Sequence, residues 1–322
     1  MNKSPLVSII ACCYNHEKFV EETLDSITTQ TYKNIELIIM DDFSTDSSAN
    51  KVNNWINTNK YECLFIQNTE NLGVVKTINK ALKKCKGKYF SLIACDDLYL
   101  PKKIENQIKI FEKLNDDYAA IYSDAYIIND DGSHHYGTQI VRKQVNKPPS
   151  GNIYHDLIKY DNFIPALSVI YKKGIIKGLG YYDENLIYED YDMLLRLSKD
   201  YKIFFQKEID VCYRIHQTNM NYNLDKPKFL DSKIKLLFKH LNTENYNSEI
   251  GFVLKEKILS LCELLYVKKS NLIYKHIKTL RYDYNYGRLI YLCKHLRLSW
   301  KSYLIIKIIF ANRHQSPILN IK

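Results

Sequence analysis

Short apolar runs alternate with segments of helical spacing over roughly the first two thirds of the chain. Four of these runs predict buried strands, at residues 6–11, 35–40, 61–66 and 89–95. Between them, apolar residues recur three to four positions apart, which indicates amphipathic helices. Strands that alternate with helices at this spacing are typical of βαβ units and a parallel sheet. We therefore predict an α/β fold with a Rossmann-like, mostly parallel sheet.

Further along, the pattern becomes more mixed. It predicts one long strand over 119–128, a hairpin turn at Asp131-Gly132, helices at 153–160, 172–179 and 189–200, and strands at 163–171, 203–205 and 211–215. Two residues mark expected helix ends in the first half. Asn15 is suited to cap the first helix, and Gly87 is suited to end the third helix as its C′ glycine.

From residue 226 onward the pattern is helical only. Helices are expected at 229–241, 250–267, 272–280 and 286–310. This region carries 19 Lys and Arg against 6 Asp and Glu, whereas the whole chain of 322 residues has a net charge of +10. We predict a first domain over 1–225, followed by a basic helical region at 226–322.

Composition places the chain among ordinary globular proteins, with 46% hydrophobic and 25% charged residues. Its eight cysteines are scattered and form no CxxC pair, so we expect small buried thiols in a reducing compartment. No run reaches the ~20 apolar residues of a membrane span, and no signal peptide is expected. The expected location is the cytoplasm, or the inner face of the plasma membrane as a peripheral protein.

Paired carboxylates follow two of the predicted strands: Asp41-Asp42 and Asp96-Asp97. In open α/β sheets, ligands bind at the carboxyl ends of the strands. Adjacent carboxylates there suit a hard divalent cation. Both pairs are also compatible with a plain structural role, as side chains that cap the helix that follows.

Four motif segments follow one another along the chain: Val7 to Asn15, Asp41 to Asp46, Asn71 to Gly73 with Asp96-Asp97, and Glu189-Asp190-Tyr191-Asp192. In this order the chain resembles the family 2 glycosyltransferases over roughly residues 5–220. The resemblance implies a GT-A fold, with a nucleotide-binding half at 1–100 and an acceptor half at 101–225. It also implies transfer of a sugar from a nucleotide-sugar with inversion at the anomeric carbon.

The resemblance implies a donor site on the first half of the chain. Residues that would contact the base, ribose, diphosphate or donor sugar are Ala11, Cys12, Tyr14, Asp42, Lys76, Asn79 and Asp96. Asp42 would accept the N3–H of uracil or thymine. Many relatives carry Arg-Asn where this chain has Ile78-Asn79, so the phosphate-facing cation would be Lys76 or would lie elsewhere. Asp97 would bind Mn²⁺ or Mg²⁺ on the diphosphate. His216 of the Tyr213-Arg214-Ile215-His216 segment would complete that site, or would be a structural hydrogen-bonding residue.

The resemblance also implies a general base. An inverting displacement requires a carboxylate that takes the proton of the acceptor hydroxyl, and Asp190 matches that position. Glu189, Pro165 and Ala166 are expected on the acceptor side. The acids at 189–190 also suit a structural role at a helix N-terminus.

The sequence therefore predicts an inverting, metal-dependent glycosyltransferase. Its donor would be a UDP- or dTDP-sugar, and its acceptor a hydroxyl of a surface glycan or lipid-linked oligosaccharide. The basic region suits an anionic membrane surface, a solvated bundle or a homo-oligomer contact. A nucleotidyltransferase is the alternative enzyme, although residues 11–15 form no Gly-rich phosphate loop. A nucleic-acid-binding protein is the other alternative, but paired acids repel phosphates, so no nucleic-acid partner is expected.

Overall fold

The computed structural model describes residues 4–219, 224–244, 248–268, 270–272 and 276. These residues form two compact units. The first holds residues 4–185 and 189–219, and the second holds 186–188 with the described residues beyond 219. The helix expected over 286–310, nearly all of the one over 272–280, and Cys293 lie outside the described residues.

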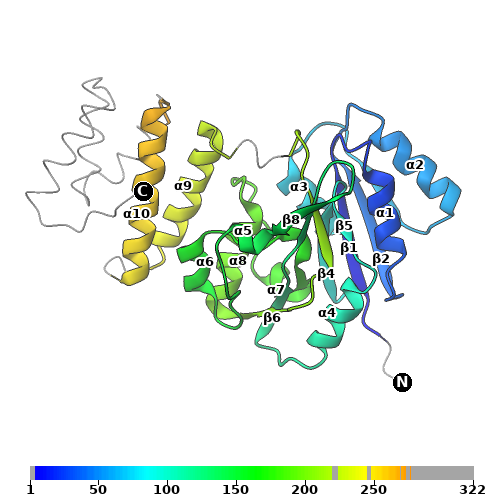
Figure 1. The fold of residues 1–322 in the computed structure, drawn as a ribbon, viewed down its shortest axis with the longest axis horizontal. Helices are drawn as coiled ribbons and strands as arrows, with labels where there is room; N and C mark the ends of the chain where they lie inside the picture. Colours follow the sequence, from blue (N-terminus) through cyan, green and yellow to red (C-terminus); the bar gives the residue numbers. More distant parts are fainter. Residues whose placement is uncertain (1–3, 220–223, 245–247, 269, 273–275, 277–322) are drawn as a thin grey trace, which may run out of the picture. The chain divides into compact units, whose positions relative to one another are not determined.

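A seven-stranded sheet forms the centre of the first unit (Figure 1). In spatial order its strands are β10 (Lys202–Phe205), β6 (Tyr118–Tyr122), β9 (Ile170–Lys172), β4 (Tyr89–Ala94), β1 (Val7–Cys13), β2 (Ile35–Asp41) and β3 (Leu64–Gln67). β9 runs antiparallel to its neighbours β4 and β6, and the other pairs are parallel. The predicted mostly parallel sheet is confirmed.

Helices cover both faces of the sheet. α1 (Val20–Thr28), α2 (Ser48–Asn59) and α4 (Lys103–Phe111) contribute Leu24, Trp55 and Ile108 to one buried cluster with Ile9 of β1. α3 (Val74–Leu82) contacts β1 and β2, and its side chains are not part of that cluster. Because successive side chains of a strand point to opposite faces, α3 covers the other face. α1, which follows β1, and α3, which follows β3, therefore lie on opposite faces of the sheet.

A smaller four-stranded sheet has the order β5 (Leu98–Tyr99), β11 (Val211–Arg214), β7 (Tyr126–Ile128) and β8 (His134–Thr138). β7 and β8 form the expected hairpin, with Gly132 at φ +83° in its turn. β11 pairs antiparallel with β5, which places Cys212 opposite Leu98. Continuing this register by two residues brings Arg214 beside Asp96. The smaller sheet thus carries residues 214–219 to the end of β4.

The long strand predicted over 119–128 is wrong, because the run forms β6 and β7, which belong to different sheets. Asp124 interrupts it. One carboxylate oxygen of Asp124 accepts hydrogen bonds from the backbone N–H groups of Ala125 (2.7 Å) and Ile140 (2.8 Å), which turns the chain between the strands. The strand predicted over 163–171 is also shorter. A 3-10 turn at Ala166–Ser168 follows Pro165, and β9 begins only at Ile170.

Two predicted helix ends are also wrong. Asn15 does not cap α1, whose N-cap residue is Phe19, and its side-chain oxygen instead accepts from the backbone N–H of Thr45 (2.8 Å). α3 ends at Leu82, five residues before Gly87. Gly87 is required for another reason, because a Cβ there would lie 2.6 Å from the carbonyl oxygen of Tyr89 and 2.7 Å from the backbone nitrogen of Ser8.

The remaining helices of the first unit are α5 (Gln139–Arg142), α6 (Tyr154–Tyr160), α7 (Lys173–Gly178) and α8 (Glu189–Asp200). The bounds of α8 match the prediction, and the Tyr191 hydroxyl of α8 donates to the carbonyl of Leu157 in α6 (2.9 Å). In the second unit α9 (Pro227–Leu241) packs against α10 (Glu249–Val267). Within the described part of the chain, no helix is long and apolar enough to cross a membrane.

Candidate active site

The carboxyl ends of β4, β1 and β2 lie level at one edge of the large sheet. Residue pairing aligns Cys13 with Asp41, and Cys12 with Ala94. The next residues extend the ladder, because Asp42 N donates to Cys13 O (2.9 Å) and Cys95 N donates to Cys12 O (2.8 Å). Each acid pair therefore begins at the edge where neighbouring strands end together.

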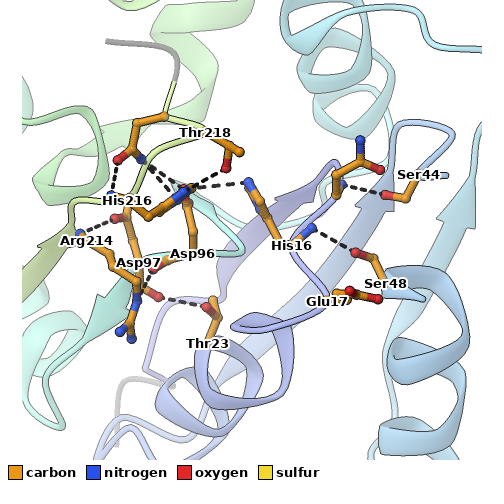
Figure 2. Close-up of polar contacts among 12 residues, drawn as sticks. His16, Glu17, Thr23, Ser44, Ser48, Asp96, Asp97, Arg214, His216 and Thr218 are labelled. Atoms are coloured by element: carbon orange, nitrogen blue, oxygen red, sulfur yellow. Dashed lines mark hydrogen bonds and ion pairs between the residues drawn. The ribbon is translucent and has the colours of Figure 1, made fainter. Parts of the chain in front are cut away.

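Asp96 is 7% exposed and its two carboxylate oxygens have different surroundings (Figure 2). Oδ2 lies 2.9 Å from Nε2 of His216, 3.4 Å from Nδ2 of Asn219 and 3.6 Å from Nε2 of His16. Oδ1 is buried and has no hydrogen-bond partner among the described residues. Burial raises the pKa of Asp96, but the His216 hydrogen bond and the nearby charge of His16 outweigh it and bring the pKa below its ordinary value.

Asp97 is also buried, and β11 holds it. The backbone N–H of Arg214 donates to Oδ1 of Asp97 (2.9 Å), and the hydroxyl of Thr23 donates to its carbonyl oxygen (2.8 Å). Burial, with the negative charge of Asp96 beside it, raises the pKa of Asp97 well above the ordinary value. Two ionised carboxylates at this position therefore require a compensating positive charge.

The predicted metal ligand His216 already uses both ring nitrogens. Nε2 faces Asp96, and Nδ1 lies 2.8 Å from the hydroxyl of Thr218. Its backbone N–H donates to Oδ1 of Asn219 (2.6 Å), so the segment after β11 folds back on itself. The arrangement orients the imidazole toward Asp96, and a metal-ligand role for His216 stays a prediction.

Asp42 lies 5% exposed at the end of β2 and accepts four hydrogen bonds. Oδ1 accepts from Asn68 Nδ2 (2.8 Å), Leu72 N (2.9 Å) and Thr77 Oγ1 (2.9 Å), and Oδ2 accepts from Gly73 N (2.9 Å). Gly73 has φ +82°, a conformation that favours glycine. In this structure Asp42 therefore fixes the turn before α3, and its predicted contact with a pyrimidine stays a prediction.

Two loops beside the acids are joined by reciprocal hydrogen bonds (Figure 2). Backbone N–H groups of the loop after β1 donate to side chains of the loop after β2: Asn15 to Ser44 Oγ (2.9 Å), His16 to Ser48 Oγ (2.8 Å) and Glu17 to Asp46 Oδ2 (3.0 Å). In return, Ser47 N donates to Glu17 Oε2 (2.9 Å). These bonds fix the backbone at His16, whose ring faces Asp96, and burial lowers the pKa of that imidazole.

Glu189 and Asp190 begin α8 and are half-buried. Asp190 Oδ2 accepts from Nδ2 of Asn162 (2.8 Å), and Oδ1 accepts from the backbone N–H of Tyr191 (2.7 Å). Burial raises the pKa of Asp190, and burial with the charge of Asp190 raises the pKa of Glu189 to about 8. A carboxylate with a raised pKa in a half-open position is suited to accept a proton.

Cys12, one of the predicted donor contacts, is half-buried near the carboxyl end of β1. Burial raises the pKa of its thiol to about 12, and the charges of Glu189 and Asp42 contribute after that of Cys13. The thiol is therefore neutral near pH 7. The cysteines within the described residues are free, and most are buried, as expected.

The other predicted site residues have varied surroundings. Tyr14 is 44% exposed, Ala11 is fully buried in β1, and Lys76 is exposed on α3. Asn79 is tied to the segment before α8, because Nδ2 donates to Tyr182 O (2.9 Å) and Glu184 Oε1 (3.0 Å). Pro165 is buried and Ala166 is exposed, both close in sequence to Asn162. Donor and acceptor contacts at these positions stay predictions.

The sequence argument did not single out His16, Asn219 or Arg214 as functional. Arg214 and Asn219 lie in the segment that drew attention to His216, but their partners are more than a hundred residues away. The only sequence signal for His16 was its place directly after a strand that ends beside paired acids. Such proximity between strand ends is visible only once the strand order is known.

The residues present fit a divalent cation. Asp97 and the unpartnered Oδ1 of Asp96 belong to adjacent residues and offer hard carboxylate oxygens. In the described part of the chain, no group of three or more His, Cys, Asp or Glu could hold a metal alone. Mn²⁺ or Mg²⁺ bound by one or two carboxylates completes its coordination with substrate phosphates and water.

Known proteins resemble the chain in sequence. A model of the family described as "Glycosyl transferase family 2" matches residues 8–158. An E. coli protein named UDP-Glc:alpha-D-GlcNAc-diphosphoundecaprenol beta-1,3-glucosyltransferase WfaP is 33% identical over 232 residues, which cover 71% of this chain and 85% of that protein. An uncharacterized glycosyltransferase of Rickettsia typhi is 32% identical over 214 residues, 66% of this chain. That match spans 65% of the Rickettsia protein, slightly less than two thirds of its length.

Solved structures resemble the chain in fold. The mannosyltransferase PcManGT of Pyrobaculum calidifontis, in complex with GDP-Man and Mn²⁺, superposes with a TM-score of 0.61 at 14% identity. The match covers 98% of this chain and 89% of that one. S. aureus TarS 1-349 in complex with UDP-GlcNAc gives a TM-score of 0.59 at 17% identity, over 81% and 72% of the two chains. The predicted GT-A fold is confirmed.

Proposed function

This chain belongs to glycosyl transferase family 2, and from that premise we propose that it transfers a sugar from a nucleotide-sugar to an acceptor hydroxyl with inversion. One observation carries the proposal. The buried, unpartnered Oδ1 of Asp96 lies beside Asp97 where β4 ends, in a unit that also presents Asp190 half-buried at the start of α8. The proposed donor site and the proposed base thus belong to one unit. The relatives favour this class over a nucleotidyltransferase or a nucleic-acid-binding protein.

We propose a UDP- or dTDP-sugar as the donor. The name of the E. coli relative gives UDP-Glc, and TarS was solved with UDP-GlcNAc, whereas PcManGT was solved with GDP-Man. The base and ribose would lie against Cys12 and Tyr14, with Asp42 and the turn that it fixes at the end of β2. Lys76, which is exposed on α3, is the proposed phosphate-facing cation.

Asp97 would hold Mn²⁺ or Mg²⁺, with Asp96 Oδ1 facing the same cation or the ribose. When bound, the cation offsets the charge of the departing diphosphate. His216 and Asn219 hold the other oxygen of Asp96, so that Oδ1 is the one left for the ligand. His216 thus acts on the site through Asp96 in this structure, and direct ligation remains its alternative role.

Asp190 is the proposed general base. Its carboxylate takes the proton from the acceptor hydroxyl as that oxygen bonds to the anomeric carbon, and the bond from this carbon to the diphosphate oxygen breaks. Asn162 donates to Asp190 Oδ2 and leaves the group oriented as an acceptor of the proton. Glu189, Pro165 and Ala166 are the proposed acceptor contacts, because they flank Asp190 or the segment of Asn162.

We propose a surface glycan or a lipid-linked oligosaccharide as the acceptor. The name of the E. coli relative specifies a GlcNAc-diphosphoundecaprenol acceptor, which is lipid-linked. The basic region from residue 226 supports a place at the anionic inner face of the plasma membrane. Its use as a contact between two copies of the chain is the alternative proposal.

A donor screen tests the proposal. The protein with MnCl₂ is incubated with UDP-, dTDP- and GDP-sugars, and binding is measured by thermal shift and turnover by release of the nucleoside diphosphate. We expect a UDP- or dTDP-sugar to bind, Asp97→Ala to lose this binding, and Asp190→Asn to bind donor without turnover. Asp200→Asn, an exposed acid at the far end of α8, is the matched control and should retain turnover. Binding of none of these sugars would exclude the proposed function.

A further inference from the structure

Arg214 binds both residues of the Asp96-Asp97 turn, one through its backbone N–H and the other through its side chain. It is 1% exposed, and its backbone N–H already holds Asp97. We propose that Arg214, oriented by Glu22, is a positioning residue that sets the Asp96-Asp97 turn for the divalent cation. The inference rests on the proposed function, because it assigns a task to a site that would bind a metal and a nucleoside diphosphate.

The register of β11 explains how Arg214 reaches the turn. Pairing of Cys212 with Leu98 places Arg214 beside Asp96, at the end of the antiparallel ladder. Its Nε–H donates to the carbonyl oxygen of Asp96 at 2.9 Å, and the hydroxyl of Thr23 donates to the carbonyl of Asp97 at 2.8 Å. The carbonyl oxygens of Asp96 and Asp97 therefore each accept a hydrogen bond from a side chain of another segment. With both peptide units held, the Cα–Cβ directions from which the two carboxylates project are set by the backbone.

The rest of the guanidinium anchors Arg214 to other segments. One terminal nitrogen donates to the carbonyl oxygens of Asn129 (3.2 Å) and Asp130 (3.1 Å), after β7. The other donates to Oε2 of Glu22 on α1 at 2.6 Å, and the guanidinium lies 4.8 Å from the ring centre of Phe19. The planar fork of arginine suits these divergent contacts, and lysine cannot reproduce them. Arg214 thus ties α1, β7 and β11 to the turn.

Glu22 is the accessible end of this arrangement. Its side chain is 55% exposed, whereas Arg214 is buried. Glu22 and Arg214 line one cavity of about 560 Å³, together with Lys18, Phe19, Asn129, Asp130 and Asp131. Replacing Glu22 therefore alters the orientation of Arg214 from the solvent side, without creating a void in the packed interior. This gives a variant that perturbs the turn with little effect on folding.

Residues that hydrogen-bond to metal ligands affect how tightly a protein binds the metal. Groups that hydrogen-bond to the ligands, and so fix their orientation, change metal affinity by about 10–100-fold when they are removed. For Arg214→Lys we expect Mn²⁺ to bind the protein about tenfold more weakly, or worse, in the presence of UDP or dTDP. Glu22→Gln keeps an acceptor for Arg214 but loses the charge, so its effect should have the same direction and be smaller.

The experiment measures Mn²⁺ binding, which does not depend on turnover. MnCl₂ is titrated into the full chain with saturating UDP, and separately with dTDP, and the free Mn²⁺ signal is followed by electron paramagnetic resonance. Thermal unfolding of each variant is recorded alongside. Arg196→Lys is the matched control, because the Arg196 guanidinium, like that of Arg214, pairs with an acid, here the buried Asp192 (2.7 Å), and binds two backbone carbonyls. It lies in α8, and its side-chain contacts avoid the Asp96-Asp97 turn.

The expected result is weaker Mn²⁺ binding by Arg214→Lys and Glu22→Gln, with Arg196→Lys unchanged even if its Tm falls by a similar amount. Unchanged Mn²⁺ affinity in folded Arg214→Lys would overturn the inference, as would an equal loss in Arg196→Lys. If Arg214→Lys does not fold, Glu22→Gln decides in the same way. Failure of the wild type to bind Mn²⁺ with either nucleotide would instead exclude the proposed donor site itself.

Discussion

Nε2 of His216 lies 2.9 Å from Oδ2 of Asp96, while Oδ1 of the same carboxylate is buried without a partner among the described residues. The hydroxyl of Thr218, 2.8 Å from the opposite ring nitrogen, sets the orientation of the imidazole. One carboxylate oxygen is thus held by the protein, and the other is left for a ligand. The pair of residues acts as an oriented acceptor at the end of β4.

His216→Ala removes this contact and should weaken nucleotide binding. A hydrogen bond to a charged group contributes about 1.5–3 kcal/mol, so the Kd for UDP or dTDP with Mn²⁺ should rise about tenfold or more. Isothermal titration calorimetry measures this change. Thr218→Val, which loses only the second contact of the ring, should have a smaller effect. An unaltered Kd in His216→Ala would contradict the role assigned to the pair.

Asn162→Ala should move the acidic limb of the pH–rate profile to higher pH. Transfer needs ionised Asp190, so kcat/KM falls as pH drops through the pKa of that carboxyl, which burial has already raised. The Asn162 hydrogen bond favours the ionised form, and its loss should shift the limb upward by about half a unit to one unit. Asn59→Ala, exposed at the end of α2, is the control. A limb that stays in place, or moves downward, argues against Asp190 as the base.

Glu189→Gln should stabilise the protein more as the pH rises. The pKa of Glu189 is raised from its ordinary 4.5 to about 8 in the folded protein. The folded form therefore retains a proton that the unfolded chain releases, and wild-type stability falls through this window. The Tm of the variant should gain on the wild type from about pH 4.5 to about 8, as recorded by circular dichroism.

Glu105→Gln provides a control of opposite sign for that experiment. The hydrogen bonds from Lys109 and Thr31 lower the pKa of Glu105, so its ionised form adds stability above the ordinary pKa of a glutamate. This variant should fall slightly below the wild type at neutral pH. Parallel pH trends in the two variants would show that the carboxyl of Glu189 is not perturbed as described.

Gly87→Ala should destabilise the fold by about 1–3 kcal/mol, because the added Cβ would meet the backbone of Tyr89 and Ser8 at 2.6–2.7 Å. Gly174→Ala is the matched substitution in α7, where nothing lies within 4 Å of the new Cβ. It should be neutral or stabilising by up to about 1 kcal/mol, because alanine favours the helix. Urea denaturation of both variants measures the difference. Similar midpoints would contradict the close approach of Gly87 to β1.

The sequence predicted those parts of the fold that depend on local spacing. β1, β2, β4 and α8 have clear apolar periods, and each lies within a few residues of its prediction. The break between β6 and β7 escaped prediction because it depends on the side chain of Asp124, which bonds the backbone at Ala125 and Ile140. A pattern of apolar residues contains no information about such a contact.

The candidate site was predictable where acids follow strands, since parallel strands end at one edge. It was not predictable where two sheets meet. The register of β11 on β5 brings Arg214 to Asp96, and the loop after β1 brings His16 to the same carboxylate. Asn79 was predicted to contact the donor, but its side-chain amide donates to Tyr182 and Glu184 instead. Nothing in the sequence indicated these tertiary contacts.

The antiparallel strand β9 has a consequence for how substrates can enter. It hydrogen-bonds to β4 on one side and to β6 on the other, so the strands of both predicted halves form one unbroken ladder. A hinge between the halves would break backbone hydrogen bonds across the middle of the sheet. We therefore expect the sheet to stay rigid during turnover, with the loops as the moving parts. Free and donor-bound forms should superpose in their strands and differ only in the segments that follow them.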